Sequence, residues 1–184
     1  MRVLVACEFS GVVRSAFRKL GHDAWSCDLI PALDGSQYHI QGDVLAVLSN
    51  GWDLMIAHPP CTYLCVSGAR WWGERKQEQE LAVEFAKALF CCAISKICME
   101  NPIGCLSTRI RKPNQIIQPW MFGHGETKAT SLWLKNLPLL KPTNIVDGRE
   151  ARIHKMPPSA DRWKLRSTTY QGIADAMAQQ WGNG

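Results

Sequence analysis

The run AHPPCTYL, residues 57–64, places a cysteine directly after two prolines at the end of an apolar stretch. Paired prolines restrict the backbone and so hold the following residue in a defined position. A thiol held there suits nucleophilic catalysis, because a thiolate is a strong nucleophile that a nearby positive charge activates. Cys61 is therefore a candidate catalytic nucleophile.

A carboxylate follows at the end of the next short apolar stretch, SKICMENP, residues 95–102. Charged side chains are seldom buried without a partner, so packing alone does not explain a glutamate at this position. Glu100 is a second candidate catalytic residue, and a capping or ion-paired glutamate is the alternative. Asn101 and Pro102 would lie beside it.

Short apolar runs, typical of buried strands, alternate with stretches that have apolar residues at helical spacing. We expect strands at residues 2–7, 22–28, 52–58, 95–100 and 131–134, and helices at 11–20, 43–50, 74–92 and 171–181. This order predicts an α/β fold with a Rossmann-like, mostly parallel, doubly wound sheet. Ligands bind such sheets at the carboxyl ends of the strands, and Cys61 and Glu100 both fall there.

Three further features fall at predicted strand ends. Ser10-Gly11 supply small residues in the turn after the first strand, where a ligand could approach the start of the helix, although an ordinary strand–helix turn would have the same composition. Asp28 ends the second strand, where an acid takes ribose hydroxyls in nucleotide-binding sheets. Asp43 opens the next helix, either as an N-cap or as a ligand contact.

These motifs resemble, in the same order, those of the DNA cytosine-C5 methyltransferases. Pro60-Cys61 is similar to the family's Pro-Cys loop, and Glu100-Asn101-Pro102 to its Glu-Asn-Val/Pro motif. The segment 122–134 resembles the Gln-x-Arg-x-Arg motif, with Glu126, Lys128 and Thr130 in place of the glutamine and the two arginines. The resemblance implies a Rossmann-like methyltransferase fold with S-adenosylmethionine as cofactor. The cofactor residues that it implies are Phe9, Ser10, Gly11, Asp28, Asp43 and Pro59.

The same resemblance implies a reaction through a covalent adduct. Cys61 would attack C6 of cytosine while Glu100 holds and protonates N3, so that C5 can accept the methyl group. Lys128 would support Glu100 or the base carbonyl electrostatically. Asn101, Pro102 and Thr130 would contact the base, which must be flipped out if it lies in duplex DNA.

Composition restricts the other classes of protein. The 184 residues fit a single methyltransferase-like domain, and no apolar stretch approaches the ~20 residues of a membrane span, so we expect a cytoplasmic protein without a membrane partner. The 8 cysteines include no Cys-x-x-Cys pair and no histidine cluster accompanies them, so we predict no metal.

The net charge of +5 is unevenly distributed. Residues 1–60 hold 4 Lys/Arg and 6 Asp/Glu, a balance of −2, whereas residues 148–166 hold 6 and 2, a balance of +4. This basic part of the loop-rich segment 136–170 suggests phosphate contacts from Arg162, Lys164 and Arg166, with a solvated surface as the alternative. About 35 residues separate Leu134 from the last helix, too few for a target-recognition domain that would bury ~1,000 Å². The chain thus resembles a small, phage-type member of the family. The resemblance implies action on DNA or a cytosine nucleotide, with a protein partner or a homodimer for target recognition.

Two other functions stay open at this point. The double proline of HPPC is shared with amino-methyltransferases that modify adenine N6 or cytosine N4, and their chemistry needs no thiol. A nucleic-acid-binding protein that kept the fold without activity would use the basic segment and stacking tryptophans such as Trp71 and Trp72, although a core position is expected for these two. His124 lies in the segment aligned beside the site and is either functional or a hydrogen-bonded structural residue.

Overall fold

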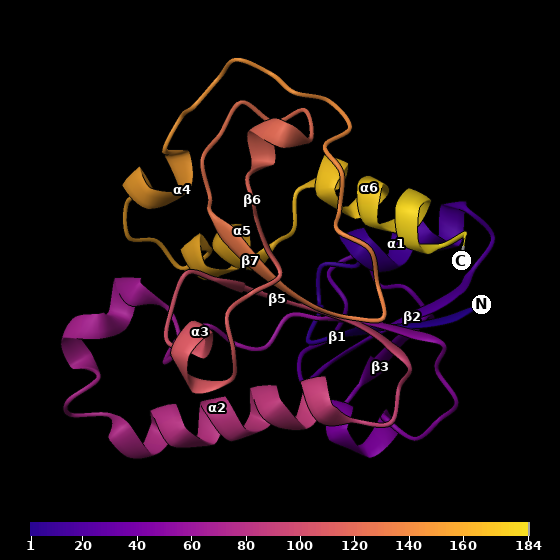
Figure 1. Ribbon diagram of the computed structural model, residues 1–184, viewed down its shortest axis with the longest axis horizontal. Coiled ribbons are helices and arrows are strands. Elements are labelled where there is room, and N and C mark those ends of the chain that lie inside the picture. The colour runs from indigo at the N-terminus through magenta and orange to yellow at the C-terminus, as the bar shows by residue number, and fades with distance from the viewer. Residues whose placement is uncertain (184) are drawn as a thin grey trace.

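The computed structural model describes residues 1–183, and for Trp71 it describes the backbone alone. A seven-stranded sheet with the order β3-β2-β1-β4-β5-β7-β6 forms its centre (Figure 1). The first five strands pair in parallel, and β7 pairs antiparallel with both β5 and β6. The strands are β1 (Arg2–Ala6), β2 (Asp23–Asp28), β3 (His39–Gln41), β4 (Leu54–Ala57), β5 (Lys96–Pro102), β6 (Gln115–Ile117) and β7 (Thr130–Lys135).

Helices cover both faces of this sheet. Figure 1 shows α1 (Val12–Lys19) and α6 (Gln171–Trp181) together on one side, and α2 (Lys76–Cys91) on the other. Two buried clusters correspond to these two layers, one containing Phe17 and Trp181 and the other Leu89 and Trp133. The shorter helices are α3 (Leu106–Arg109), α4 (Arg152–Lys155), α5 (Arg162–Ser167) and the 3₁₀ turns η1 (Val44–Val47), η2 (Val66–Trp71) and η3 (Pro119–Met121). The predicted α/β class and the doubly wound, mostly parallel sheet are confirmed.

Local sequence explains where these elements begin and end. All four residues of β4 are buried, as expected of a central parallel strand covered on both faces. Helix α1 ends at Gly21, which has a φ of 83° and donates its N–H to the carbonyl of Arg18, while His22 donates to Phe17. This is a Schellman motif, in which glycine takes the left-handed conformation that follows the helix.

The position of the site follows from the strand order. The chain moves outward from β1 to β3 and then returns to β4 on the other side of β1, so β1 and β4 form the switch point at which doubly wound sheets bind ligands. Strands β4 and β5 pair with Ala57 opposite Met99. The next residue of each strand is His58 and Glu100, so the register itself places these two side by side.

Several elements differ from the sequence expectation. The predicted helix at 43–50 is only the 3₁₀ turn η1, because Asp43 caps it and the chain must return at once into β4. Strands β3 and β6 have three residues each and carry no clear alternating pattern. The segment 136–170, expected to be loop-rich, also contains α4 and α5. Trp72 packs against the α2-side core as expected, whereas the side chain of Trp71 lies outside the described residues.

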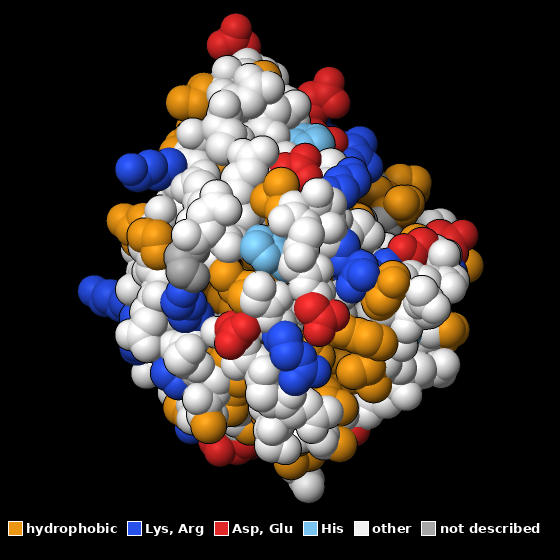
Figure 2. Space-filling model, turned by 90° about the vertical axis from the view of Figure 1, so that its right-hand side faces the viewer, with side chains coloured by type: hydrophobic (Ala, Val, Ile, Leu, Met, Phe, Trp, Pro, Cys, Tyr) orange, Lys and Arg blue, Asp and Glu red, His pale blue; other side chains and the backbone are white. Residues whose placement is uncertain are grey.

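The surface on the side of the two chain ends has mixed charge. Figure 2 shows acidic and basic side chains interspersed over this side of the molecule. Among residues 1–183, no helix is long and apolar enough to cross a membrane, and no group of three or more potential metal-ligating side chains forms.

Candidate active site

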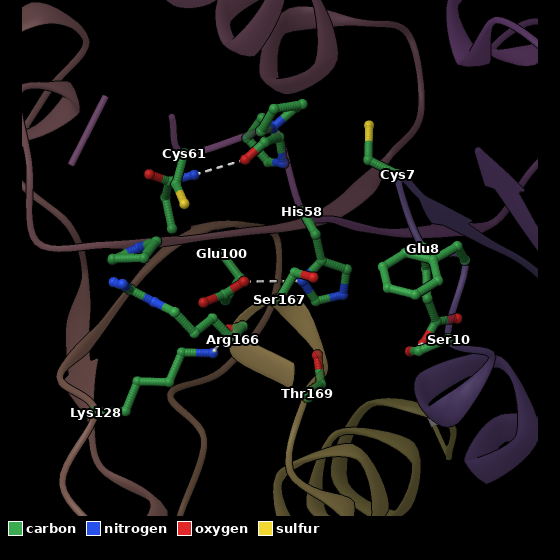
Figure 3. Close-up of a pocket in the computed structure, with 15 residues that line it drawn as sticks. Cys7, Glu8, Ser10, His58, Cys61, Glu100, Lys128, Arg166, Ser167 and Thr169 are labelled. Atoms are coloured by element: carbon green, nitrogen blue, oxygen red, sulfur yellow. Dashed lines mark hydrogen bonds and ion pairs between the residues drawn. The ribbon is translucent and has the colours of Figure 1, made fainter. Parts of the chain in front are cut away.

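A cavity of about 80 Å³ lies at the carboxyl ends of β1, β4 and β5. The sequence-predicted residues Cys61, Glu100 and Lys128 all line it, although they are separated by up to 67 positions in the chain (128 − 61 = 67). Figure 3 shows these side chains converging from the loop after β4, from β5 and from the segment before β7. Other residues that line the cavity are Phe9, Ser10, His58, Pro59, Asn101, Pro102 and Arg166.

Glu100 is held by a histidine. Its Oε2 lies 2.9 Å from Nδ1 of His58, and the two side chains are 17% and 10% exposed. Burial raises the pKa of Glu100. The hydrogen bond and charge of His58, together with the charge of Lys128, lower this pKa by more than burial raises it, so the pKa lies below its usual value. The carboxylate is therefore available as a hydrogen-bond acceptor or as a relay for a proton.

Asn101 connects the two strand ends that carry the candidate catalytic groups. Its Nδ2 donates to the carbonyl of Pro59 at 2.8 Å, and the side chain is 1% exposed. Its Oδ1 is buried and has no hydrogen-bond partner in the described part of the chain. This bond holds the prolines before Cys61 against β5.

Cys61 is a half-buried free thiol. A hydrogen bond with Cys65, burial and the negative charge of Glu100 raise its pKa well above the usual value, and the positive charge of Lys128 offsets only part of this increase. The sulfur of Cys65 in turn lies 2.9 Å from the hydroxyl of Ser67. Because only the thiolate is a strong nucleophile, the cation at Lys128 is the feature of the site that favours attack by Cys61.

Lys128 reaches the cavity from the opposite side of the cleft. Its Nζ donates to the carbonyl of Arg166 at 2.8 Å, which ties the segment before β7 to the end of α5. Its backbone N–H donates to Oε1 of Gln118 at 3.0 Å. The lysine thus acts on Cys61 and Glu100 through its charge, and it also positions Arg166.

A larger cleft of about 1220 Å³ adjoins the cavity and shares Cys61, His58, Lys128 and Arg166 with it. Asp28 and Asp43 line its far end, beside the apolar side chains of Ile30, Val44 and Leu45. Small-molecule sites usually enclose ~300–1,000 Å³, so this cleft has room for more than one ligand. Asp28 has its pKa raised by burial, and its Oδ1 accepts one long bond, 3.3 Å, from the N–H of Ile30. Asp43 accepts from the N–H of Leu45 at 2.9 Å, so it is an N-cap and a lining residue at once.

The turn after β1 differs from a simple anion-binding helix start. Glu8, 4% exposed, accepts hydrogen bonds from the N–H groups of Val13 and Arg14 at 2.7 and 3.2 Å. The first N–H groups of α1 are therefore satisfied by the protein's own carboxylate. Gly11, with a φ of 74°, lies against the guanidinium of Arg14, where a β-carbon would collide with it. Phe9 and Ser10 line the cavity, whereas Gly11 does not.

Three other candidate residues, Thr130, Lys164 and His124, line neither the cavity nor the larger cleft. Thr130 is buried in β7, and its hydroxyl donates to the carbonyl of Lys128 at 3.0 Å, so it cannot contact a substrate in this arrangement. Lys164 points to Asp161, 3.2 Å away, because the two are one turn apart on α5. Arg162 lines the cleft and Arg166 lines both spaces. His124 accepts a bond from the N–H of Gly172 at 3.0 Å and so has a structural role at the start of α6.

Sequence reasoning missed two members of the site, Glu8 and the pairing role of His58. Glu8 gave no signal, because a glutamate in a strand–helix turn has an ordinary composition. For His58 the signal was present: if β4 and β5 are parallel neighbours ending together, the residue before Pro59 must lie beside Glu100. The strand ends, however, were predicted only to within two or three residues.

Comparisons with known proteins support the fold. No family model matches the chain, and no curated protein matches it. Among solved structures, the chain is similar to a "putative DNA modification methyltransferase" encoded within an E. coli prophage, with a TM-score of 0.53 and 13% identity. The match covers 79% of this chain and 52% of that one, so this chain spans about half of that protein's length. At this identity the likeness shows the fold alone, and it agrees with the Rossmann-like fold expected from the sequence.

Proposed function

We propose that the protein is an S-adenosylmethionine-dependent methyltransferase that modifies C5 of cytosine through a covalent Cys61 adduct. The observation that supports this proposal most strongly is the meeting of Cys61, Glu100 and Lys128 around one cavity. Amino-methyltransferase chemistry needs neither the thiol nor the buried carboxylate, and His58, which would have to contact an amino group, is instead bonded to Glu100. This arrangement favours the C5 reaction.

In the proposed reaction each residue has one task. Cys61 attacks C6 as its thiolate, which the charge of Lys128 favours. Glu100 holds N3 and protonates it as the ring loses its aromaticity. Asn101 holds the loop of Cys61 at a fixed distance from Glu100 through the carbonyl of Pro59.

The larger cleft fits the proposed cofactor. Asp28 has a carboxylate with spare acceptor capacity for ribose hydroxyls, and the apolar side chains beside Asp43 suit an adenine ring. Phe9 lines both spaces, Ser10 and Pro59 line the smaller cavity with Cys61, and Gly11 allows the close turn after β1. When bound, the cofactor would supply an electrophilic methyl group for C5.

We infer a DNA or cytosine-nucleotide substrate from the charges opposite the sheet. Arg162 and Arg166 line the cleft beside Lys128, where they would contact phosphates. The similar prophage protein is described as a DNA modification methyltransferase, which agrees with this class of substrate.

The direct test is covalent trapping on an oligonucleotide that contains 5-fluorocytosine, in the presence of S-adenosylmethionine. Fluorine at C5 cannot leave as a proton does, so the adduct persists and is visible by mass spectrometry of the intact protein. We expect an adduct with the unmodified protein and none with Cys61→Ser. Cys91→Ser, which changes an exposed cysteine on α2, is the matched control and should form the adduct normally.

Two results would contradict the proposal. One is a protein that methylates DNA without forming any adduct, and the other is an adduct that survives in Cys61→Ser. A rise in 5-methylcytosine among nucleosides of cells that express the protein, absent with Cys61→Ser, would support the reaction independently of the trap.

A further inference from the structure

His58 occupies a position that its backbone fixes firmly. Its N–H donates to the carbonyl of Ala6 at 2.9 Å, which joins the end of β4 to β1. The parallel register of β4 and β5 then leaves the ring directly beside Glu100, with Nδ1 and Oε2 2.9 Å apart. The imidazole is thus oriented by the central strands of the sheet and not by a loop.

The second ring nitrogen of His58 is unusual. Nε2 is buried and has no hydrogen-bond partner among the described residues. Figure 3 shows the ring between Glu100 on one side and Glu8 with Ser10 on the other. Burial raises the pKa of Glu8, and the charge of His58 opposes that increase, which places the imidazole within electrostatic reach of both carboxylates. A polar atom buried without a partner in a polar cavity is a site for a water or a ligand group.

The groups around the ring leave His58 as the hydrogen-bond partner of Glu100. The titratable and charged groups that line the cavity with His58 come from every neighbouring element, and they are Cys7, Glu8, Cys61, Glu100, Lys128 and Arg166. The two cations lie on the far side and Lys128 donates to the carbonyl of Arg166, so neither replaces His58 as the hydrogen-bond donor to Glu100. An imidazolium donates through both nitrogens and would neutralise a buried carboxylate.

We infer that His58 orients Glu100 and stores the proton that Glu100 passes to N3 of the cytosine ring. This inference rests on the proposed function. When the Cys61 sulfur bonds to C6, the C5–C6 π bond breaks and its electrons are delocalised through C4 to N3. The Glu100 carboxylate takes the Nδ1 proton of His58, which becomes neutral imidazole, and passes a proton on to N3. After C5 has accepted the methyl group, a base takes the C5 proton, the C5–C6 π bond re-forms as the Cys61 thiolate leaves, and the N3 proton returns to His58 by the same route.

The test compares adduct formation by His58→Asn with that of the unmodified protein in single turnovers between pH 6 and 9. Asparagine keeps a donor near the position of Nδ1 but stores no proton. We expect oligonucleotide binding to stay within about twofold, while the rate of adduct formation falls about 100-fold, as for loss of a general acid. The decline of the rate toward high pH should also disappear. His22→Asn, at the end of α1 and outside both spaces, is the matched control and should keep the normal rate and pH profile.

A second measurement needs no activity. Nitrogen-15 NMR of the imidazoles in the unmodified protein should show a proton on Nδ1 of His58, and this signal should be lost in Glu100→Ala. The inference is overturned if His58→Asn keeps the normal rate and pH profile, or if Nδ1 carries no proton. If the unmodified protein forms no adduct at all, the proposed reaction is wrong. The NMR result would then still show whether the His58–Glu100 pair exists.

Discussion

The two sides of the cleft are built in different ways. One side, the sheet wall, consists of Glu8, His58, Cys61, Glu100 and Asn101 at the ends of β1, β4 and β5. The other, the C-terminal wall, consists of Lys128, Arg162, Trp163 and Arg166. Strand register and buried hydrogen bonds hold the sheet wall. The C-terminal wall is carried largely by α5, a helix with no buried residue.

Few contacts attach the C-terminal wall to the rest of the molecule. The bond from Lys128 Nζ to the carbonyl of Arg166 lies within the wall, whereas the ring of Trp163 lies 5.3 Å from that of Phe9, centre to centre, on the other side of the cleft. Behind them, Glu126 accepts bonds from Tyr170 and Arg152. The groups proposed to make and break bonds are therefore on the rigid side, and the groups proposed to bind phosphate are on the side with less burial. Regions with few buried contacts open at lower free energy, which suits a wall that must admit a polymer.

The largest loss of activity should come from a substitution in the sheet wall. In Glu100→Gln the amide cannot relay a proton to N3, so adduct formation on 5-fluorocytosine should slow by about 10²–10⁴-fold. Single-turnover rates measure this directly. Glu84→Gln, which removes an exposed carboxylate on α2 paired with Lys87, should react at the normal rate. A rate within threefold of normal for Glu100→Gln would remove Glu100 from the proposed chemistry.

A variant of Asn101 tests whether the hydrogen bonds of the sheet wall also stabilise the fold. Asn101→Leu should lower the free energy of unfolding by about 1–3 kcal/mol, because the buried carbonyl of Pro59 loses its donor. Denaturant unfolding measures the loss, and adduct formation should slow in parallel because the loop of Cys61 is no longer held to β5. Asn183→Ala removes a comparable but exposed bond, to the carbonyl of Gln179, and should change stability by less than about 0.5 kcal/mol. Equal losses in the two variants would argue against a special role for the buried bond.

The difference between the sheet wall and the C-terminal wall also explains which site residues could be predicted from sequence. Apolar runs such as 52–58 and motifs at strand ends predicted the sheet, and with it Cys61 and Glu100, because burial on both faces leaves a clear pattern. Lys128 was predicted only through a resemblance. Thr130 and Lys164 face away from the cleft for local reasons, a bond to a neighbouring carbonyl and an ion pair along α5, and residue type does not report such orientations.

Lys128 belongs to the C-terminal wall but acts through its charge on Cys61 and Glu100 of the sheet wall, so its removal should affect chemistry more than stability. Lys128→Met removes the cation that lowers the pKa of Cys61, so this pKa rises and less thiolate is present at a given pH. Adduct formation should therefore shift to higher pH and slow by about tenfold near neutrality. The pH profile of single-turnover rates measures the shift. Lys87→Met, on the exposed side of α2, should leave the profile in place. A profile that moves to lower pH in Lys128→Met would contradict the assigned direction.

The smallest effect should come from Trp163, which is 50% exposed and meets Phe9 across the cleft. Because Trp163 on α5 and Phe9 both line the cleft of the proposed cofactor, Trp163→Ala should weaken S-adenosylmethionine binding by about 0.5–1.5 kcal/mol, roughly 2–10-fold, without changing the free energy of unfolding by more than about 0.5 kcal/mol. Titration calorimetry measures the first quantity and denaturant unfolding the second. Trp120→Ala, which removes an aromatic ring stacked on Arg149 away from the cleft, should bind the cofactor normally. If Trp163→Ala lost as much stability as Asn101→Leu, the C-terminal wall would be as firmly built as the sheet wall, and the proposed division between a chemical side and a binding side would fail.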